Sequence, residues 1–251
     1  MNLKTTVRLS LVALIAVIAA CSQLKEKPIV DFVMKDFKAE SVPGCKGDSA
    51  CASFEVQYPE FLSLDTTVRN SIDEKVNYIL NGSAGEPKSL EALGNDFIKD
   101  FNQFTKDMPG YDLGWYFRGK VQVLISSDTL ISLQVDTESF TGAVHASYTT
   151  NFVNVDPKTG TAFLLDAMLR PGYREELNRL GEEDLRSQLE LGERDSLALP
   201  EVDGKFQMTD NYGFRKEGVV FYFNDYEVGG SFVEGPIEIL IPYERLRDWM
   251  K

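Results

Sequence analysis

The hydrophobic pattern changes its period between residues 106 and 115, and this change restricts the fold more than any other feature. Before that point, apolar residues recur at helical spacing in segments 66–80 and 89–106. After it, apolar and polar residues alternate in 115–125 and 130–140, as in a half-buried hairpin that turns at Ser127-Asp128. Strands and helices do not alternate regularly with glycine-rich turns. We therefore predict an α+β fold, an antiparallel sheet with packed helices, and not a doubly wound nucleotide-binding fold.

The remaining segments predict further strands and two more helices. Pro59 is expected to end a strand over 51–58 because proline cannot donate to a sheet ladder. A helix is expected over 172–192, with Gly181 as its candidate break. The other expected elements are a first strand near 32–34, strands at 148–155, 161–165, 206–208, 219–223 and 237–241, and a last helix at 243–250.

The N-terminal segment has the pattern of an export signal. Lys4 and Arg8 precede the apolar run Leu9–Ala20, which is too short to span a bilayer as a helix. The run ends in Ile-Ala-Ala before Cys21, which resembles the lipobox of bacterial lipoproteins. That resemblance implies cleavage before Cys21 and acylation of its thiol with long chains such as palmitate. Each buried methylene contributes about 0.8 kcal/mol, so several chains would hold the protein at a membrane.

This interpretation divides the N-terminus into a signal peptide, residues 1–20, and a tether, residues 21–29. An Asp after the cysteine would resemble an inner-membrane retention signal, whereas this chain has Ser22. We therefore expect a lipid-anchored protein of the cell envelope, at the outer membrane if the host has one.

The net charge limits the classes of partner. The chain has 26 Lys and Arg against 39 Asp and Glu, a formal charge of −13. Loss of residues 1–20 removes Lys4 and Arg8 and no acid, which gives −15. Nucleic acids and anionic lipid surfaces are bound through cationic residues, so both classes of partner are disfavoured. A partner attracted by charge would be basic or neutral.

Two cysteines remain once Cys21 is acylated. Cys45 and Cys51 are an even pair in an oxidising compartment, and we predict a disulfide between them. A redox pair more often has two intervening residues, and a metal site would need further ligands. The closed loop is short, so its entropic contribution is only about 2 kcal/mol.

Evidence for catalysis is weak. His145 is the single histidine, and HExxH, GxSxG and phosphate-binding glycine motifs are absent. We expect His145 to be structural, with ligand contact as the alternative. Asp136 and Glu138 share a strand face, as glycosidase carboxylates can, but a solvated sheet face is the favoured explanation. No metal and no cofactor is expected.

Several motifs in order resemble one family of extracytoplasmic domains. They are Cys51–Pro59, which is similar to the opening strand of PdaC-like domains, and Thr141–His145, Tyr148–Phe152, Asp156–Gly160, Phe221–Val228, Gly235-Pro236 and Ile241–Tyr243, which are similar to RsiV-like domains. The resemblance implies a PdaC-like N-terminal part over 30–140 and an RsiV-like C-terminal part over 141–251. It also implies a module that is usually non-catalytic. No deacetylase motifs follow, and too few residues precede the apolar run for a cytoplasmic sigma-factor-binding region, so we expect only the envelope binding module.

The expected function is ligand binding in the envelope. The family resemblance points to lysozyme, a basic protein, or to a cell-wall glycan. Exposed aromatic residues favour protein or sugar contacts, so Tyr222 and Tyr226 of the aromatic strand are candidates for contact. His145, in the connection between two strands, and the nearby Tyr148 are the other candidates. The alternatives are a peptidoglycan-modifying enzyme and a structural envelope lipoprotein without a small ligand.

Overall fold

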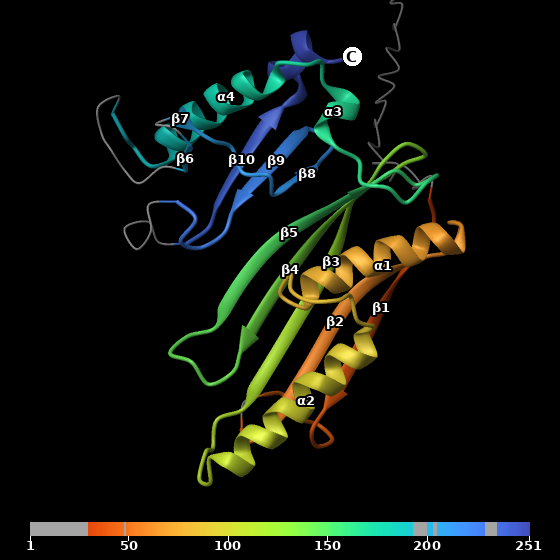
Figure 1. The fold of residues 1–251 in the computed structure, drawn as a ribbon, viewed down its shortest axis with the longest axis vertical. Helices are drawn as coiled ribbons and strands as arrows, with labels where there is room; N and C mark the ends of the chain where they lie inside the picture. Colours follow the sequence, from red (N-terminus) through yellow and green to blue (C-terminus); the bar gives the residue numbers. More distant parts are fainter. Residues whose placement is uncertain (1–29, 48, 193–199, 203–204, 229–234) are drawn as a thin grey trace, which may run out of the picture.

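The protein consists of two lobes that lie end to end along its longest axis (Figure 1). The computed structural model describes residues 30–47, 49–192, 200–202, 205–228 and 235–251. The N-terminal lobe comprises residues 30–155, the connection residues 156–164, and the C-terminal lobe residues 165–251. Within the part of the chain that the structure describes, no helix is both long and apolar enough to cross a membrane.

The N-terminal lobe is built on a five-stranded sheet with its strands in sequence order. The strands are β1 (Phe32–Glu40), β2 (Ala52–Phe61), β3 (Trp115–Ser126), β4 (Ile131–Phe140) and β5 (Ser147–Val155). Neighbours are antiparallel except β2 and β3, which run parallel because the intervening helices return the chain to the same edge. The α+β prediction is confirmed, and the sheet is mixed, not purely antiparallel.

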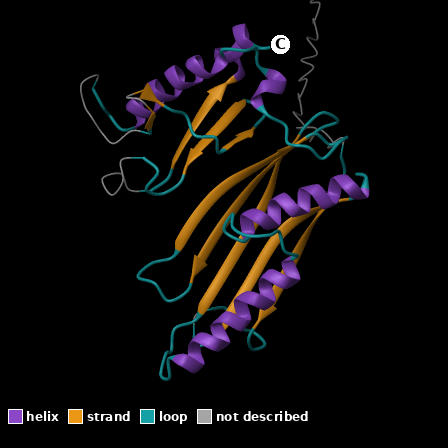
Figure 2. Ribbon diagram, in the orientation of Figure 1, coloured by secondary structure: helices purple, strands orange, loops and turns teal. Residues whose placement is uncertain are grey.

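Two helices cover one face of this sheet (Figure 2). They are α1 (Thr66–Leu80) and α2 (Leu90–Asp107). Each begins where the sequence predicts, because Asp65 accepts a hydrogen bond from the Thr67 amide and Ser89 accepts one from the Ala92 amide. Their apolar stripes pack on the inward-facing residues of the sheet, which form the core of this lobe.

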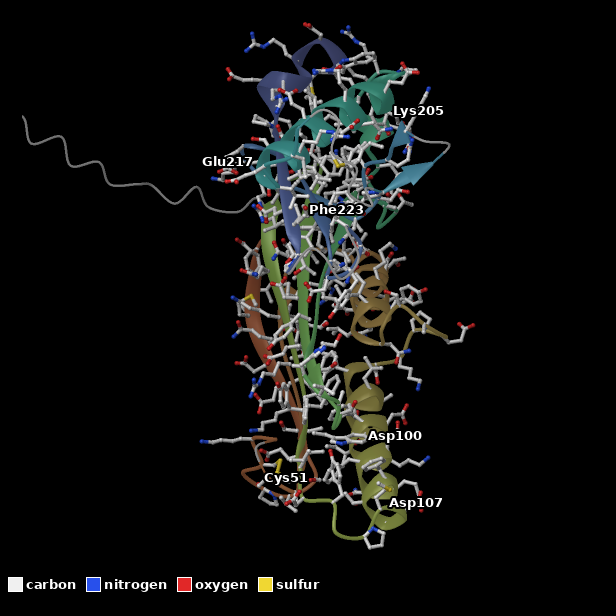
Figure 3. All side chains as sticks on the ribbon, turned by 90° about the vertical axis from the view of Figure 1, so that its left-hand side faces the viewer. Cys51, Asp100, Asp107, Lys205, Glu217 and Phe223 are labelled. Atoms are coloured by element: carbon white, nitrogen blue, oxygen red, sulfur yellow. A yellow bond between two sulfur atoms is a disulfide. The ribbon has the colours of Figure 1, made fainter. Side chains whose placement is uncertain are left out.

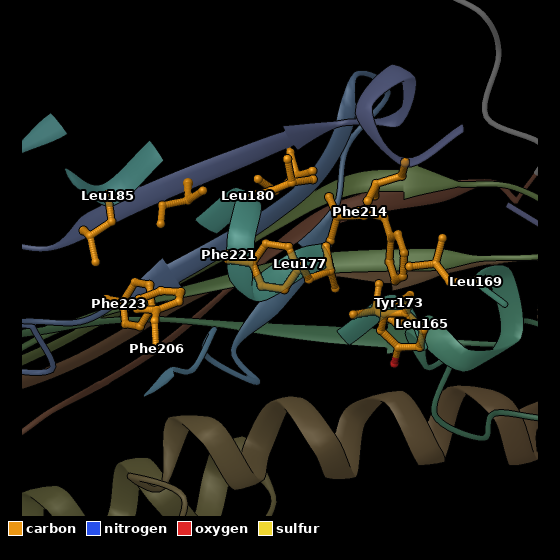
Figure 4. Packing of buried hydrophobic residues seen from close by; sticks show 14 of the residues in the cluster. Leu165, Leu169, Tyr173, Leu177, Leu180, Leu185, Phe206, Phe214, Phe221 and Phe223 are labelled. Carbon is orange, nitrogen blue, oxygen red and sulfur yellow. The ribbon is translucent and has the colours of Figure 1, made fainter. Parts of the chain in front are cut away.

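The C-terminal lobe is a smaller sheet packed against a helix. Its elements are α3 (Leu165–Met168), α4 (Tyr173–Gln188), the hairpin β6 (Glu201–Val202) and β7 (Lys205–Phe206), the sheet β8 (Tyr212–Phe214), β9 (Gly218–Phe223) and β10 (Ile237–Pro242), and a 3₁₀ helix, η2 (Tyr243–Trp249). Leucines of α4 pack on the aromatic residues of β8 and β9 in a second core (Figure 4). The antiparallel order β10-β9-β8 buries β9 in the centre.

Three local predictions were wrong. Residues 161–165 do not form a strand, since Ala162 makes only an isolated bridge with Val155 and Leu165 begins α3. Strand β2 continues through Pro59, whose register partner is Met34 of β1. The parallel ladder to β3 ends at Gln57, so the missing amide of Pro59 removes no bond on that side. Helix α4 continues through Gly181. The residue is a glycine for a packing reason, since a Cβ there would clash with the Met208 methyl carbon. That glycine lets β7 and its neighbours approach the helix closely.

The predicted disulfide is present between Cys45 and Cys51 (Figure 3). It closes the loop that leads into β2, where the Cys51 carbonyl accepts a hydrogen bond from the Trp115 amide. Cys21 and the predicted signal peptide lie outside the described residues.

The lobes meet through apolar and polar groups. Leu130, between β3 and β4, is buried in the apolar cluster of the C-terminal lobe. The Ser132 hydroxyl of β4 accepts a hydrogen bond from the Phe214 amide at 2.9 Å and donates one to Asn154 at 2.7 Å. The Thr150 amide of β5 donates to the Asn224 side chain at 2.8 Å. These bonds hold β8 and the end of β9 against β4 and β5. The predicted division at residue 141 falls between β4 and β5, so it lies inside the first sheet and not between the lobes.

Candidate functional site

The face of the five-stranded sheet opposite α1 and α2 is only partly covered. We call it the open face. Strand β8 contacts β3, β4 and β5 there, near the C-terminal lobe. Towards the end that carries Cys51, helix α2 lies on the other side of the sheet (Figure 3). On this stretch Arg118 and Lys120 are exposed, whereas Val121 on the helix-covered face is fully buried.

Five side chains gather on the open face at this end of the sheet, and we call them the aromatic platform. They are Tyr116, Arg118, Glu138, Phe140 and Tyr148. The strand register explains why they meet. Tyr116 pairs with Phe140, and Arg118 pairs with Glu138, which pairs in turn with Tyr148. Cross-strand partners lie on the same side of a sheet and within contact distance.

The Glu138 carboxylate joins the platform together. It accepts hydrogen bonds from the hydroxyls of Tyr116 at 3.0 Å and Tyr148 at 3.3 Å. Its second oxygen lies 3.2 Å from Nη1 of Arg118. The three donors come from two different strands, so one acid fixes the orientation of both phenols and of the guanidinium.

The rings are arranged for further stacking contacts. The guanidinium carbon of Arg118 lies 4.4 Å from the ring centroid of Tyr116, a cation–π arrangement. Tyr116 and Phe140 stack with centroids 5.9 Å apart and planes inclined by 24°. Tyr148 is 56% exposed, so a large aromatic surface faces solvent at a fixed place on the sheet.

The phenols of the platform remain neutral donors at physiological pH. Burial, followed by the hydrogen bond to Glu138, raises the pKa of Tyr116 above its ordinary value. The negative charge of Glu138 is the largest cause that raises the pKa of Tyr148. An ionised Glu138 therefore favours the protonated, donating form of both tyrosines.

A second polar row separates the platform from the C-terminal lobe. The Asp136 carboxylate accepts hydrogen bonds from Gln122 at 2.7 Å, Gln134 at 2.9 Å and Thr150 at 2.8 Å. Asp136 and Glu138, which we considered as a glycosidase pair, are thus both bonded to neighbouring side chains. This arrangement accounts for them as parts of a hydrogen-bonded sheet face.

The structure places the four predicted contact residues differently. His145 is exposed in the β4–β5 loop, with Nδ1 3.0 Å from the Ala146 carbonyl oxygen. Tyr148 is a member of the platform. Tyr226 is 64% exposed in the turn after β9. Thr150 lies two residues after Tyr148, Asn224 lies two residues before Tyr226, and these two residues form the hydrogen bond between the lobes. Tyr222 is half-buried in β9 opposite Glu238 and lies outside the platform.

Sequence reasoning missed Tyr116, Arg118 and Phe140 as members of a binding surface. A partial signal exists, since the predicted hairpin brings Tyr116 near Phe140. A turn centred on Ser127-Asp128 would pair Tyr116 with Ser139, whereas the observed turn, with a register shift between Val123 and Ile125, pairs it with Phe140. The structure also bears on metal binding. Among the described residues, no group of three or more His, Cys, Asp or Glu side chains is placed to hold a metal ion.

Comparison with known proteins places the fold. Residues 166–244 match the model of a protein family of unknown function, DUF3298. A crystal structure of a DUF3298 family member from Bacteroides fragilis is 19% identical, with a TM-score of 0.65 over 90% of this chain and 96% of that one. A DUF3298 protein from Pseudomonas aeruginosa is 20% identical, with a TM-score of 0.65 over 88% of this chain and 94% of that one. No curated protein sequence matches. The fold is thus that of DUF3298 proteins, and the narrower RsiV and PdaC resemblance stays a prediction.

Proposed function

We propose that this protein is a non-catalytic binding module of the bacterial cell envelope and that the aromatic platform is its ligand-binding surface. The observation that carries the proposal is the platform itself, with Tyr116, Arg118 and Tyr148 joined through one acid on a sheet face that the helices leave open. Tyr and Arg are enriched among residues that contribute most to protein interfaces. Their prior ordering by Glu138 lowers the entropy lost when a ligand binds.

The ligand that fits best is a basic protein, with lysozyme as the specific candidate. The open face is broad and strand-built, which suits a protein surface. Acidic residues outnumber basic ones on it, and these are Asp36, Glu40, Glu55, Asp136 and Glu138 against Lys38, Arg118 and Lys120. The whole chain is also acidic, with a formal charge of −13, which speeds encounter with a cationic partner. A cell-wall glycan is the second candidate, because the stacked rings of Tyr116 and Phe140 offer apolar faces to a sugar.

The proposal includes the anchor. Acylation of Cys21 after removal of residues 1–20 would hold the protein at a membrane, and the residue after the cysteine, Ser22, favours the outer one. Metabolic labelling with a palmitate analogue tests this step. Incorporation that is lost in Cys21→Ala would support it, and equal labelling of the two proteins would contradict it.

Calorimetric titration of a soluble fragment, residues 22–251, tests the binding function. A c-type lysozyme and a muropeptide mixture are titrated separately at near-physiological salt, with a basic protein unrelated to lysozyme as control. We expect saturable binding of lysozyme that survives added salt. Arg118→Ala and Tyr148→Ala should each weaken it at least tenfold, a change of about 1.4 kcal/mol. Lys120→Ala, a neighbouring charge on the same face, should change it by less than about threefold.

Four outcomes would contradict the proposal. Binding that the control protein matches would reduce it to nonspecific charge attraction. Platform variants that bind like the wild type would move the site elsewhere. Release of modified peptidoglycan by the fragment would favour an enzyme, and a lack of all binding would favour a structural lipoprotein.

A further inference from the structure

A second candidate site lies between the lobes, away from the platform. It is a cleft of about 550 Å³, within the size range of small-molecule sites, which occur preferentially at domain interfaces. Both lobes and the connection contribute aromatic or apolar walls: Tyr78 of α1, Phe152 of β5, Phe163 and Leu164 of the connection, Tyr173 of α4 and Tyr212 of β8.

The floor of the cleft is fixed by the core of the C-terminal lobe. The rings of Phe163 and Tyr212 pack edge-on against Phe214, with centroids 5.5 Å and 5.8 Å apart. The Tyr212 hydroxyl accepts a hydrogen bond from the Leu165 amide at 3.2 Å. Tyr173 is only 3% exposed, and its hydroxyl points out of the apolar cluster (Figure 4). These rings are therefore held in place before any ligand enters.

The mouth of the cleft carries apolar surface in contact with solvent. Tyr78 of the N-terminal lobe is 39% exposed, and Leu164 of the connection is 53% exposed. A ligand that enters would cover both side chains. Burial of apolar surface contributes roughly 25 cal/mol per Å², so the mouth favours a ligand with an apolar body.

The charges around the cleft favour a cation. Its lining includes three carboxylates, Glu74, Asp166 and Asp210, against two cations, Lys75 and Arg174. Both cations already have partners. Nη1 of Arg174 lies 3.7 Å from Asp210, and the Lys75 ammonium donates to the Ser71 hydroxyl at 2.7 Å. The negative charge that remains, together with several aromatic rings, is the combination that attracts organic cations.

We propose that this cleft binds a small organic cation with an apolar body, such as a quaternary ammonium compound that carries an aromatic ring. The inference does not depend on the proposed function of the platform. The lining has one net negative charge, which disfavours an anion, and a neutral molecule would gain apolar burial without the cation–π and charge contributions.

Calorimetry with three probes that share a benzyl group tests the charge preference. They are benzyltrimethylammonium, neutral N-benzylacetamide and anionic phenylacetate, each titrated into the 22–251 fragment. We expect the cation to bind at least tenfold more tightly than either of the others, since an order of magnitude corresponds to about 1.4 kcal/mol. Equal affinity for the neutral probe, tighter binding of the anion, or no saturable binding of the cation would overturn the proposal.

Substitutions then locate the site. Tyr78→Ala and Glu74→Gln should each weaken binding of the cation by about threefold to tenfold, in the range of single cation–π and charge contributions. Tyr78→Phe keeps the ring and should retain most of the affinity, which separates loss of the ring from loss of the fold. Tyr148→Ala on the platform is the matched control and should leave cation binding unchanged. Cation binding that falls equally in Tyr148→Ala would overturn the assignment to the cleft. Lysozyme binding measured on Tyr78→Ala shows independently whether the platform is intact.

Discussion

The two sheets of this molecule use their faces differently. In the N-terminal lobe, the middle of β4 alternates between fully buried Leu133 and Val135 and half-exposed Gln134 and Asp136, because helices cover one face and the other is open beyond the contact with β8. In the C-terminal lobe, β9 has a nearly continuous apolar run, and Val220 and Phe221, which face opposite ways, are both buried. The difference shows which sheet is free to bind a ligand. A strand that alternates leaves a surface, whereas a strand that is apolar throughout is enclosed.

The strongest test of this contrast compares one phenylalanine from each sheet. Phe214 of β8 is fully buried, and its ring packs on Phe163 and Tyr212. Phe214→Ala should lower the free energy of unfolding by about 3–5 kcal/mol, the usual result of emptying a packed site. Phe140→Ala on the platform should lower it by less than about 1 kcal/mol. Urea denaturation of both variants measures the difference, and similar losses would show that the platform is part of a core.

A smaller effect is expected at the contact between the sheets. Ser132 is fully buried and bonds both to the Phe214 amide and to Asn154. Ser132→Ala would leave a buried amide without its acceptor, and we expect a loss of about 1–3 kcal/mol in the free energy of unfolding. Ser147→Ala, an exposed serine on β5, is the control and should stay within about 0.5 kcal/mol. An unchanged free energy of unfolding in Ser132→Ala would mean that water replaces the serine and that the lobes are joined by other contacts.

The smallest expected effect concerns pH and distinguishes a buried tyrosine from an exposed one. Burial, then a hydrogen bond to Asp166, raises the pKa of Tyr173 to about 12. In the unfolded chain the pKa is close to 10, so unfolded molecules release this proton first as the pH rises. The contribution of the Tyr173 hydroxyl to the free energy of unfolding is therefore complete below about pH 10 and decreases between about pH 10 and pH 12.

The measurement is the free energy of unfolding at about pH 9 and about pH 11 for the wild type and Tyr173→Phe. The wild type should lose on the order of 1 kcal/mol more than the variant over this interval.

On the platform the cause is different, because the charge of Glu138 raises the pKa of Tyr148. Glu138→Gln should thus lower the pKa of Tyr148 in an absorbance titration, and an unchanged pKa would remove Glu138 from that role.

Local signals in the sequence predicted much of this fold. Helices α1 and α2 could be placed because Asp65 and Ser89 cap them and their apolar stripes have helical spacing. The alternation in β3 and β4 identified the polar face that proves to be open. The parallel pairing of β2 with β3 and the unbroken α4 depend on contacts distant in sequence, and no local pattern encodes them.

The two candidate sites differ in the same way. Tyr116 and Phe140 of the platform belong to one hairpin, so the sequence predicts that they lie close together, although the register shift between Val123 and Ile125 decides that they pair. The cleft brings together Tyr78, Phe152 and Tyr212, which come from three separate elements. Only the packing of one lobe on the other creates that site.

The direction of β1 has a consequence for how the platform is presented. The chain enters the sheet near the C-terminal end of β3, where the Val30 carbonyl accepts a hydrogen bond from the Ser126 hydroxyl. Strand β1 ends at Glu40, which pairs with Ser53 of β2, and Ser53 pairs with Tyr116 of the platform. The nine residues of β1 span about 30 Å at roughly 3.3 Å each. Under the proposed anchoring at Cys21, the sheet would act as a rigid stand-off, with the attachment at one end and the platform at the other. Changes in tether length would then alter how far the protein reaches, while the distance from Val30, where the tether meets the sheet, to the platform stays set by the strand.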